Sequence, residues 1–157
     1  MNVVVLDANA VVMHGRAFPD RVRTAVEEGL TLVLPRSVKQ ELVDDVLAAE
    51  NAPVNHHASA QAIQQLVDDG FLVLRIPDFE TYSGVIDEAR QRIADDTLPE
   101  HTVKADQYIP ALVCGLATDE TVHLATADTK LRAIVQDIVT QHGVGEDVIL
   151  RDPLTVL

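Results

Sequence analysis

Several residue types are scarce in this chain of 157 residues, and each shortage excludes something. Tryptophan is absent and aromatic residues make up only 3%, so the hydrophobic core must be built from aliphatic side chains. The one cysteine, Cys114, has no partner for an internal disulfide. Because it lies within the apolar stretch ALVCGLA, we interpret it as a core residue rather than a nucleophile.

Long hydrophobic runs are also missing. The apolar runs have the length of strands and are too short to span a bilayer, and the amino terminus does not have the layout of a signal peptide. We therefore expect a cytoplasmic protein with no membrane partner.

Positive charge is the third shortage. The 12 Lys and Arg residues face 25 Asp and Glu residues, which gives a formal net charge of -13. Nucleic acids are usually bound through basic residues, so this balance is unexpected for a nucleic-acid-binding protein. The preference for aspartate suggests adaptation to concentrated intracellular salt, because short hydrated carboxylates keep a surface soluble when charges are screened. A preference for a basic partner is the alternative that composition leaves open.

Strand-like apolar runs alternate with helical patterns along the whole chain. This alternation predicts an α/β fold, a three-layer α/β/α arrangement with a central, mostly parallel sheet. With 47% hydrophobic residues, the chain can fill the core of a single domain spanning residues 1–157. The predicted strands are 3–6, 30–34, 71–76, 122–125 and 148–150, and the predicted helices are 19–29, 37–50, 58–69, 79–95, 104–117 and 129–142.

Four carboxylates occupy positions that a parallel sheet would bring together. Asp7 follows the first strand and Asp128 the fourth, while Glu41 and Asp106 lie near the starts of two helices. Strand carboxyl ends and the following helix amino ends share one edge, where ligands bind in open α/β sheets. Four carboxylates at that edge would repel one another unless a cation lay between them, and Mg²⁺ or Mn²⁺ suits such oxygen ligands. Alternatively, Asp7 serves only to cap the next helix.

The ordered set of acids resembles that of the PIN-domain nucleases. The matching stretches are VVVLDANA with Asp7 and Asn9, SVKQELVDD with Glu41, ADQYIPALVCGLA with Asp106 and Ile109, and LATADTKL with Thr126 and Asp128. The resemblance covers residues 3 to about 135. It departs from the family pattern at Pro110, which could kink a helix, and at residues 51–70 and 97–101 on the expected substrate-facing rim.

This resemblance implies a PIN-like fold and a metal-dependent endoribonuclease that hydrolyses RNA phosphodiester bonds at the four-carboxylate site. Asp7, Asp106 and Asp128 would hold Mg²⁺ or Mn²⁺, directly or through water. Glu41 would complete the site or orient the attacking water. The relatives of similar size are toxins of toxin–antitoxin pairs, and RNA-processing nucleases share the same site.

The resemblance also assigns supporting roles and partners. Asn9 and Thr126 would hydrogen-bond to the carboxylates, as groups behind metal ligands do. Besides RNA, the candidate partners are an antitoxin protein and a second copy of the chain. From their positions near the predicted edge, the candidate phosphate contacts are Arg16, Arg36, Lys104, Lys130 and Arg132.

Two other functions fit part of the pattern. Haloacid-dehalogenase-like phosphatases also begin with an apolar strand and an Asp, but Asn9 and Val11 stand where that family needs Asp and Thr. A non-catalytic PIN-like module for RNA binding or assembly is the stronger alternative. The presence of all four acids argues against it.

Overall fold

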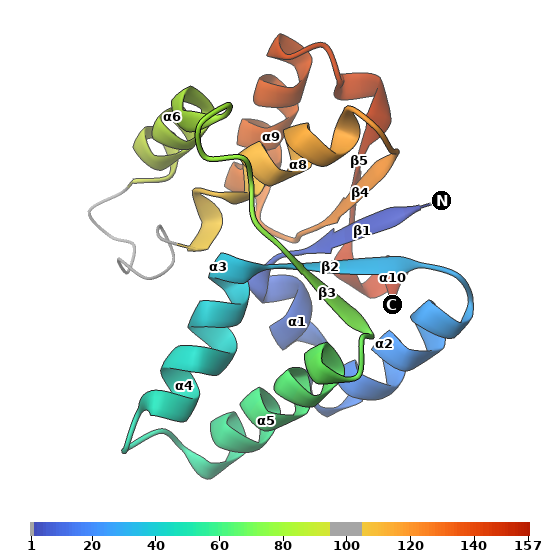
Figure 1. Cartoon of the computed structure of the whole chain (residues 1–157), viewed down its shortest axis with the longest axis vertical. Helices are drawn as coiled ribbons and strands as arrows, with labels where there is room; N and C mark the ends of the chain where they lie inside the picture. Colours follow the sequence, from blue (N-terminus) through green and yellow to red (C-terminus); the bar gives the residue numbers. More distant parts are fainter. Residues whose placement is uncertain (1, 95–104) are drawn as a thin grey trace.

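The computed structural model describes residues 2–94 and 105–157. At its centre, in the described part of the chain, is a five-stranded sheet in the order β3-β2-β1-β4-β5 (Figure 1), and every neighbouring pair of strands is parallel. The strands are β1 (Val3–Leu6), β2 (Thr31–Pro35), β3 (Leu72–Arg75), β4 (Val122–Ala125) and β5 (Val148–Arg151).

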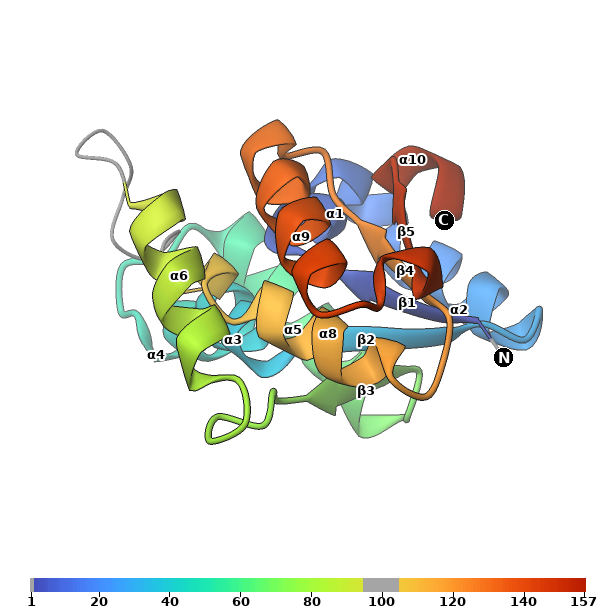
Figure 2. The same cartoon turned by 90° about the horizontal axis from the view of Figure 1, so that it is seen from above.

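Helices cover both faces of this sheet, as Figures 1 and 2 show. One layer contains α1 (Ala8–His14), α2 (Phe18–Glu27), α3 (Arg36–Lys39), α4 (Asp45–Ala48), α5 (Val54–Asp68) and α10 (Pro153–Val156). The other contains α6 (Ser83–Ile93), α8 (Ile109–Ala117) and α9 (Thr129–Gln141). The predicted α/β/α architecture is confirmed.

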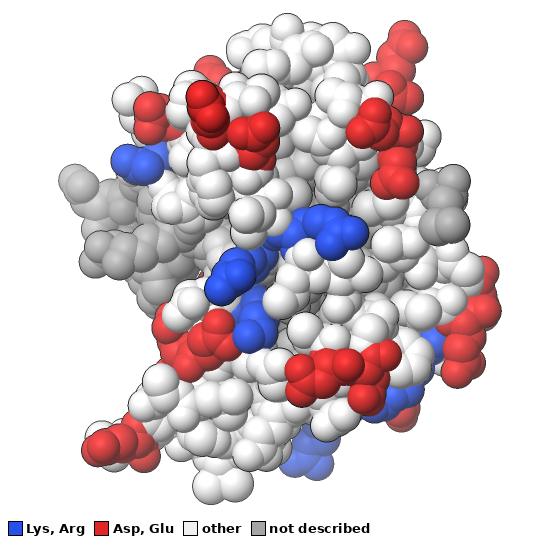
Figure 3. Space-filling view, in the orientation of Figure 1, with Lys and Arg blue, Asp and Glu red and all other residues white. Residues whose placement is uncertain are grey.

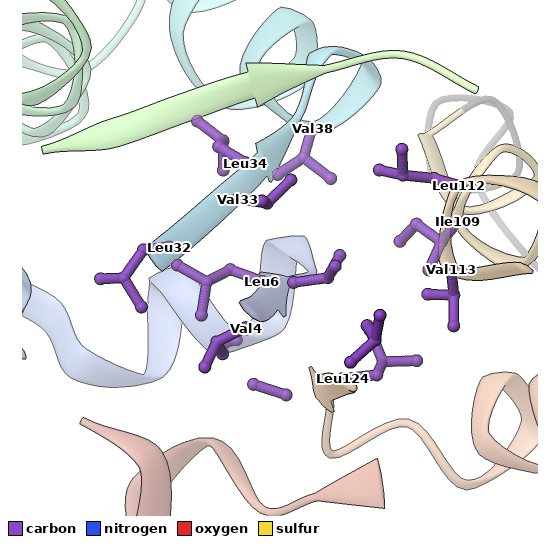
Figure 4. Packing of buried hydrophobic residues seen from close by; sticks show 14 of the residues in the cluster. Val4, Leu6, Leu32, Val33, Leu34, Val38, Ile109, Leu112, Val113 and Leu124 are labelled. Carbon is purple, nitrogen blue, oxygen red and sulfur yellow. The ribbon is translucent and has the colours of Figure 1, made fainter. Parts of the chain in front are cut away.

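Burial on both faces explains why the strands read as unbroken apolar runs. All four residues of β1 are at most 3% exposed. In Figure 4, Ile109, Leu112 and Val113 of α8 point from their helix toward the strands, where Leu6 and Leu124 lie. Aliphatic side chains fill this core, as the shortage of aromatics predicts, and Cys114 is buried within it.

The strand register places two polar residues side by side at the carboxyl edge of the sheet. Leu6 of β1 pairs with Ala125 of β4. The next residues on the two strands are Asp7 and Thr126, so the register brings them level with each other. The polar end of the sheet therefore begins directly where its apolar strands stop.

The sequence patterns did not predict the short helix α1. Asp7 is its N-cap, and its Oδ1 accepts a hydrogen bond of 2.7 Å from the backbone N of Ala10. The helix presents Val12 and Met13 to solvent at 62% and 43% exposure, so its sequence lacks a clean amphipathic period. The proposed capping role of Asp7 is therefore real, and the question is whether Asp7 also has a second role.

Pro110 does not break a helix. It occupies the first turn of α8, where its missing N–H removes no intrahelical hydrogen bond. The expected helix over 104–117 is shorter than predicted, because Gln107 and Tyr108 form a turn between Asp106 and α8.

The carboxyl tail packs back on the body of the protein as α10, against α1. His14 Nε2 lies 3.1 Å from the Pro153 carbonyl oxygen, and Arg21 Nη1 lies 2.6 Å from His14 Nδ1. Because arginine can only donate and a carbonyl can only accept, His14 is the neutral tautomer that carries its proton on Nε2. Within the described residues, no helix is both long and apolar enough to cross a membrane.

Candidate active site

Thr126 links two of the predicted site residues. Its side chain hydrogen-bonds to the Asp7 carboxylate, and its Oγ1 accepts a bond of 3.1 Å from the backbone N of Asp128. Thr126 is fully buried and Asp7 is 2% exposed. Asp128 caps α9, with Oδ1 accepting from the backbone N of Lys130 and Leu131. One oxygen of each aspartate is thus held by a helix terminus, and the turn fixes both side chains.

Asp106 and Glu41 come from elements on different faces of the sheet (Figure 1). Asp106 lies in a helical turn just before α8 and is 9% exposed. Ser37 supports this turn, because its Oγ donates a 2.9 Å hydrogen bond to the carbonyl of the adjacent Ala105. Glu41 lies in a π-helical stretch, η2 (Gln40–Asp44). Such wide turns often occur at functional sites, where they change the direction of one side chain.

The charges of the four acids act on one another. Burial raises the pKa of the Asp106 carboxyl from 3.8 to about 7. The negative charges of the other three acids add to this rise, in the order Asp7, Asp128, Glu41.

Asp7 shows the same effect in weaker form. Burial raises the pKa of its carboxyl, the hydrogen bonds from Thr126 and Ala10 oppose the rise, and the charge of Asp128 adds to it. In both carboxyls, burial and the neighbouring acids therefore favour the protonated form.

Comparison with known proteins decides the family. The family model of the halobacterial PIN domain matches residues 1–157. The chain belongs to this family.

Solved structures support the PIN fold. The crystal structure of VapBC2 from Rickettsia felis bound to a DNA fragment from their promoter contains a chain that is 15% identical, with a TM-score of 0.52. The similarity covers 96% of the present chain and 98% of that chain. At this identity the likeness concerns the fold alone. No curated protein matches the chain.

PIN nucleases generally use divalent metals, and the donor set of this PIN domain has the right chemistry. The candidate ligands are carboxylate oxygens, which hard cations prefer. Burial, together with the charges of the three neighbouring acids, raises the pKa of Asp106 to about 7. Among residues 2–94 and 105–157, no three acidic, His or Cys side chains are grouped closely enough to hold one ion directly. Mg²⁺ usually keeps several waters and is bound through one or two carboxylates, so it does not require three such side chains in direct contact.

The other residues that were predicted to belong to the PIN site lie at different places around it. Asn9 is exposed in the first turn of α1. Arg16 is exposed beyond the far end of that helix, about 10 Å of helix away from Asp7. Arg36 is exposed at the start of α3. Lys104 lies outside the described residues.

Lys130 and Arg132 serve the structure around Asp128. The Lys130 Nζ donates a 3.1 Å hydrogen bond to the Ile93 carbonyl at the end of α6. An Nη1 of Arg132 lies 3.4 Å from the Thr126 carbonyl oxygen. Lys130 therefore connects the start of α9 to the end of α6, and Arg132 contacts the turn that carries Asp128.

Sequence reasoning missed a cavity of about 440 Å³ beside Glu41. Its lining includes Arg75, Phe79 and Tyr108, for which the sequence patterns predict no role. Arg75 ends β3 and pairs with Pro35 of β2, so it lies at the same edge of the sheet as Asp7. The rule that identified Asp7, a polar residue at a strand's carboxyl end, would have found Arg75 as well.

Proposed function

We propose that this PIN-domain protein is a metal-dependent endoribonuclease of the cytoplasm. The observation that carries the proposal is the buried Asp106 carboxyl, whose pKa rises to about 7 through burial and through the charges of three neighbouring acids. A stable fold keeps such a cluster only at a cost in free energy, and clusters of this kind are typical of functional sites. A divalent cation would remove the repulsion.

Each residue has a specific task in this proposal. Asp7, Asp106 and Asp128 hold Mg²⁺ or Mn²⁺, directly or through water. The Thr126 hydroxyl and the helix termini at Ala10 and Lys130 hold two of these carboxylates in place. When bound, divalent ions stabilise charge on the scissile phosphate and supply an activated water.

Glu41 is half-buried, as Asp128 is, whereas Asp7 and Asp106 are buried. Glu41 lines the cavity of about 440 Å³, and its charge acts on Asp106. From there it can orient the attacking water and accept its proton. This is the role of a general base, which must lie within hydrogen-bond reach of the water.

RNA is the proposed substrate, and the partner would be an antitoxin protein. The support is membership of the PIN family and likeness of fold to a chain of a VapBC complex. A homodimer is the further expected assembly. A toxin and an RNA-processing enzyme share this chemistry, and they differ in whether a small DNA-binding protein is encoded beside the gene.

Cleavage of labelled single-stranded RNA tests the proposal. The wild type should cut it in Mn²⁺ or Mg²⁺ and not in EDTA, and Asp106→Asn should lose about 100-fold or more, as when a group that stabilises transition-state charge is removed. Asp68→Asn, on the exposed surface of α5, is the matched control. RNA binding without divalent-dependent cleavage would instead support the non-catalytic module.

A further inference from the structure

The cavity beside Glu41 has a lining suited to a nucleotide. It lies where β2 and β3 end, between the start of α3 and the turn before α8, and its volume of about 440 Å³ is in the usual range for a small-molecule site. Pro35, Ile76 and Leu112 are among its apolar walls. Phe79 and Tyr108 add two aromatic rings.

Phe79 is the unusual member of this lining. It is one of three phenylalanines in the chain, yet it is 50% exposed. Its ring meets that of Tyr108 edge-on, with centroids 5.7 Å apart and an interplanar angle of 86°. The turn that carries it is fixed, because the Asp78 carboxylate accepts hydrogen bonds from Thr81 and from the Glu80 backbone N. An open aromatic face is therefore held in place before any ligand arrives.

Two arginines line the same cavity as this ring. Arg36 and Arg75 both line the cavity and are exposed, and neither forms an ion pair with a carboxylate in the described parts of the chain. With a net charge of -13, carboxylates are abundant, so two arginines without such an ion pair are unexpected. Figure 3 shows cationic side chains gathered in the middle of this face, over the ends of β2 and β3, with acidic side chains around them.

The cavity also adjoins the carboxylates. Glu41 lines it, and so do Ala105 and Gln107 on either side of Asp106. Val5 pairs with Val33, so continuing the register places Asp7 level with Pro35, which pairs with Arg75. Two strand spacings separate Asp7 from Arg75, which is about 10 Å. A chain whose phosphate lies at the carboxylates would therefore run past this cavity.

Resting on the proposed function, we propose that this cavity is a nucleotide-binding subsite for single-stranded RNA. A base stacks on Phe79, and the guanidinium groups of Arg36 and Arg75 contact phosphates beside the cleaved bond. Stacking on aromatic rings together with cationic contacts to the backbone is how proteins bind single strands without strong sequence preference. The net negative charge of the protein repels phosphate, but the two arginines would attract it at this one place.

Fluorescence anisotropy with two oligonucleotide probes distinguishes binding of the bases from binding of the phosphates. One probe is a short mixed-sequence RNA, and the other is an abasic oligomer of the same length. Both are measured in Ca²⁺, with intact RNA verified on a gel. Phe79→Ala should weaken binding of the base-bearing probe about tenfold, within the range for loss of one stacked base. It should leave the abasic probe unchanged, and Phe79→Tyr should bind like the wild type.

The double variant Arg36→Ala/Arg75→Ala should weaken binding of both probes. It should also lower the slope of log affinity against log salt by about 0.7 for each phosphate that the variant no longer neutralises. The charged control is Arg23→Ala, at a half-buried position on α2, and the apolar control is Val54→Ala, at an exposed position on α5. Both should bind the probes like the wild type. Thermal melts confirm that each variant is folded.

The outcomes distinguish this inference from the proposed function. If the wild type cleaves RNA but Phe79→Ala binds both probes like the wild type, the cavity takes no base, and a peptide of a partner protein becomes its better occupant. Equal loss on the abasic probe, or an arginine variant that matches Arg23→Ala, also overturns the inference. If the wild type neither binds nor cleaves RNA, the proposed function fails, and the subsite fails with it.

Discussion

Asp106 should make the metal-free protein less stable as the pH rises. In the folded protein this carboxyl keeps its proton up to a pH of about 7, whereas its ordinary pKa is 3.8. Between these values the folded state binds more protons than the unfolded state, so the free energy of unfolding falls with rising pH. A rise of about 3 pKa units corresponds to about 4 kcal/mol, and Asp7 takes up part of this effect because the acids titrate together.

Asp106→Asn removes the charge and nearly preserves the shape. At pH 8 in EDTA the variant should be more stable than the wild type. The gain is smaller than 4 kcal/mol, because a buried amide that loses hydrogen bonds to water costs about 1–3 kcal/mol. We therefore expect a net gain of about 1–3 kcal/mol and a flatter pH profile between 4 and 7.

Urea denaturation at constant KCl, from pH 4 to 8, measures this directly. Urea is preferable to guanidinium chloride, because a salt would screen the repulsion under study. Asp68→Asn should follow the wild-type profile. If Asp106→Asn is less stable than the wild type at pH 8 and keeps its slope, burial and the neighbouring acids do not raise the pKa of Asp106 as described, and the reasoning is refuted.

Three further predictions concern other parts of the protein. Burial lowers the pKa of His14, so its contribution to stability should be lost as the pH drops below 6.5, and in the Asp106→Asn background His14→Gln should make that loss smaller in urea melts. With a net charge of -13, the melting temperature should rise from dilute buffer to molar KCl, and a flat or falling series would contradict salt adaptation. Thr126→Ala should weaken Mn²⁺ binding about 10- to 100-fold, whereas Thr126→Ser should retain it, as calorimetry can show.

The sheet was predictable from the sequence because its central strands are continuous apolar runs. A strand buried on both faces must be apolar throughout, so β1 and β2 stand out in the sequence. Once the strands are parallel, their carboxyl ends share an edge, and Asp7 and Asp128 fall there without further information. The fold class and the grouping of the acids at one edge follow from this rule.

What could not be predicted depends on local geometry. Helix α1 buries few apolar residues, so no period marks it, and only the N-cap Asp7 signals its start. The π-helical turn that carries Glu41 has no sequence pattern that we recognise. The pocket combines Arg75 at a strand end with Phe79 and Tyr108 from two later segments, and only folding brings these together.

Calorimetric titration with Mn²⁺ tests most directly whether the four acids form one metal site. The wild type should bind Mn²⁺, and at a free concentration of about 100 times the dissociation constant it should gain about 2.7 kcal/mol of stability. Each of the four single variants that turns Asp7, Glu41, Asp106 or Asp128 into its amide should bind at least about tenfold more weakly, and Asp68→Asn should bind like the wild type. A wild type that binds no Mn²⁺, or four variants that all bind it with unchanged affinity, would contradict the account.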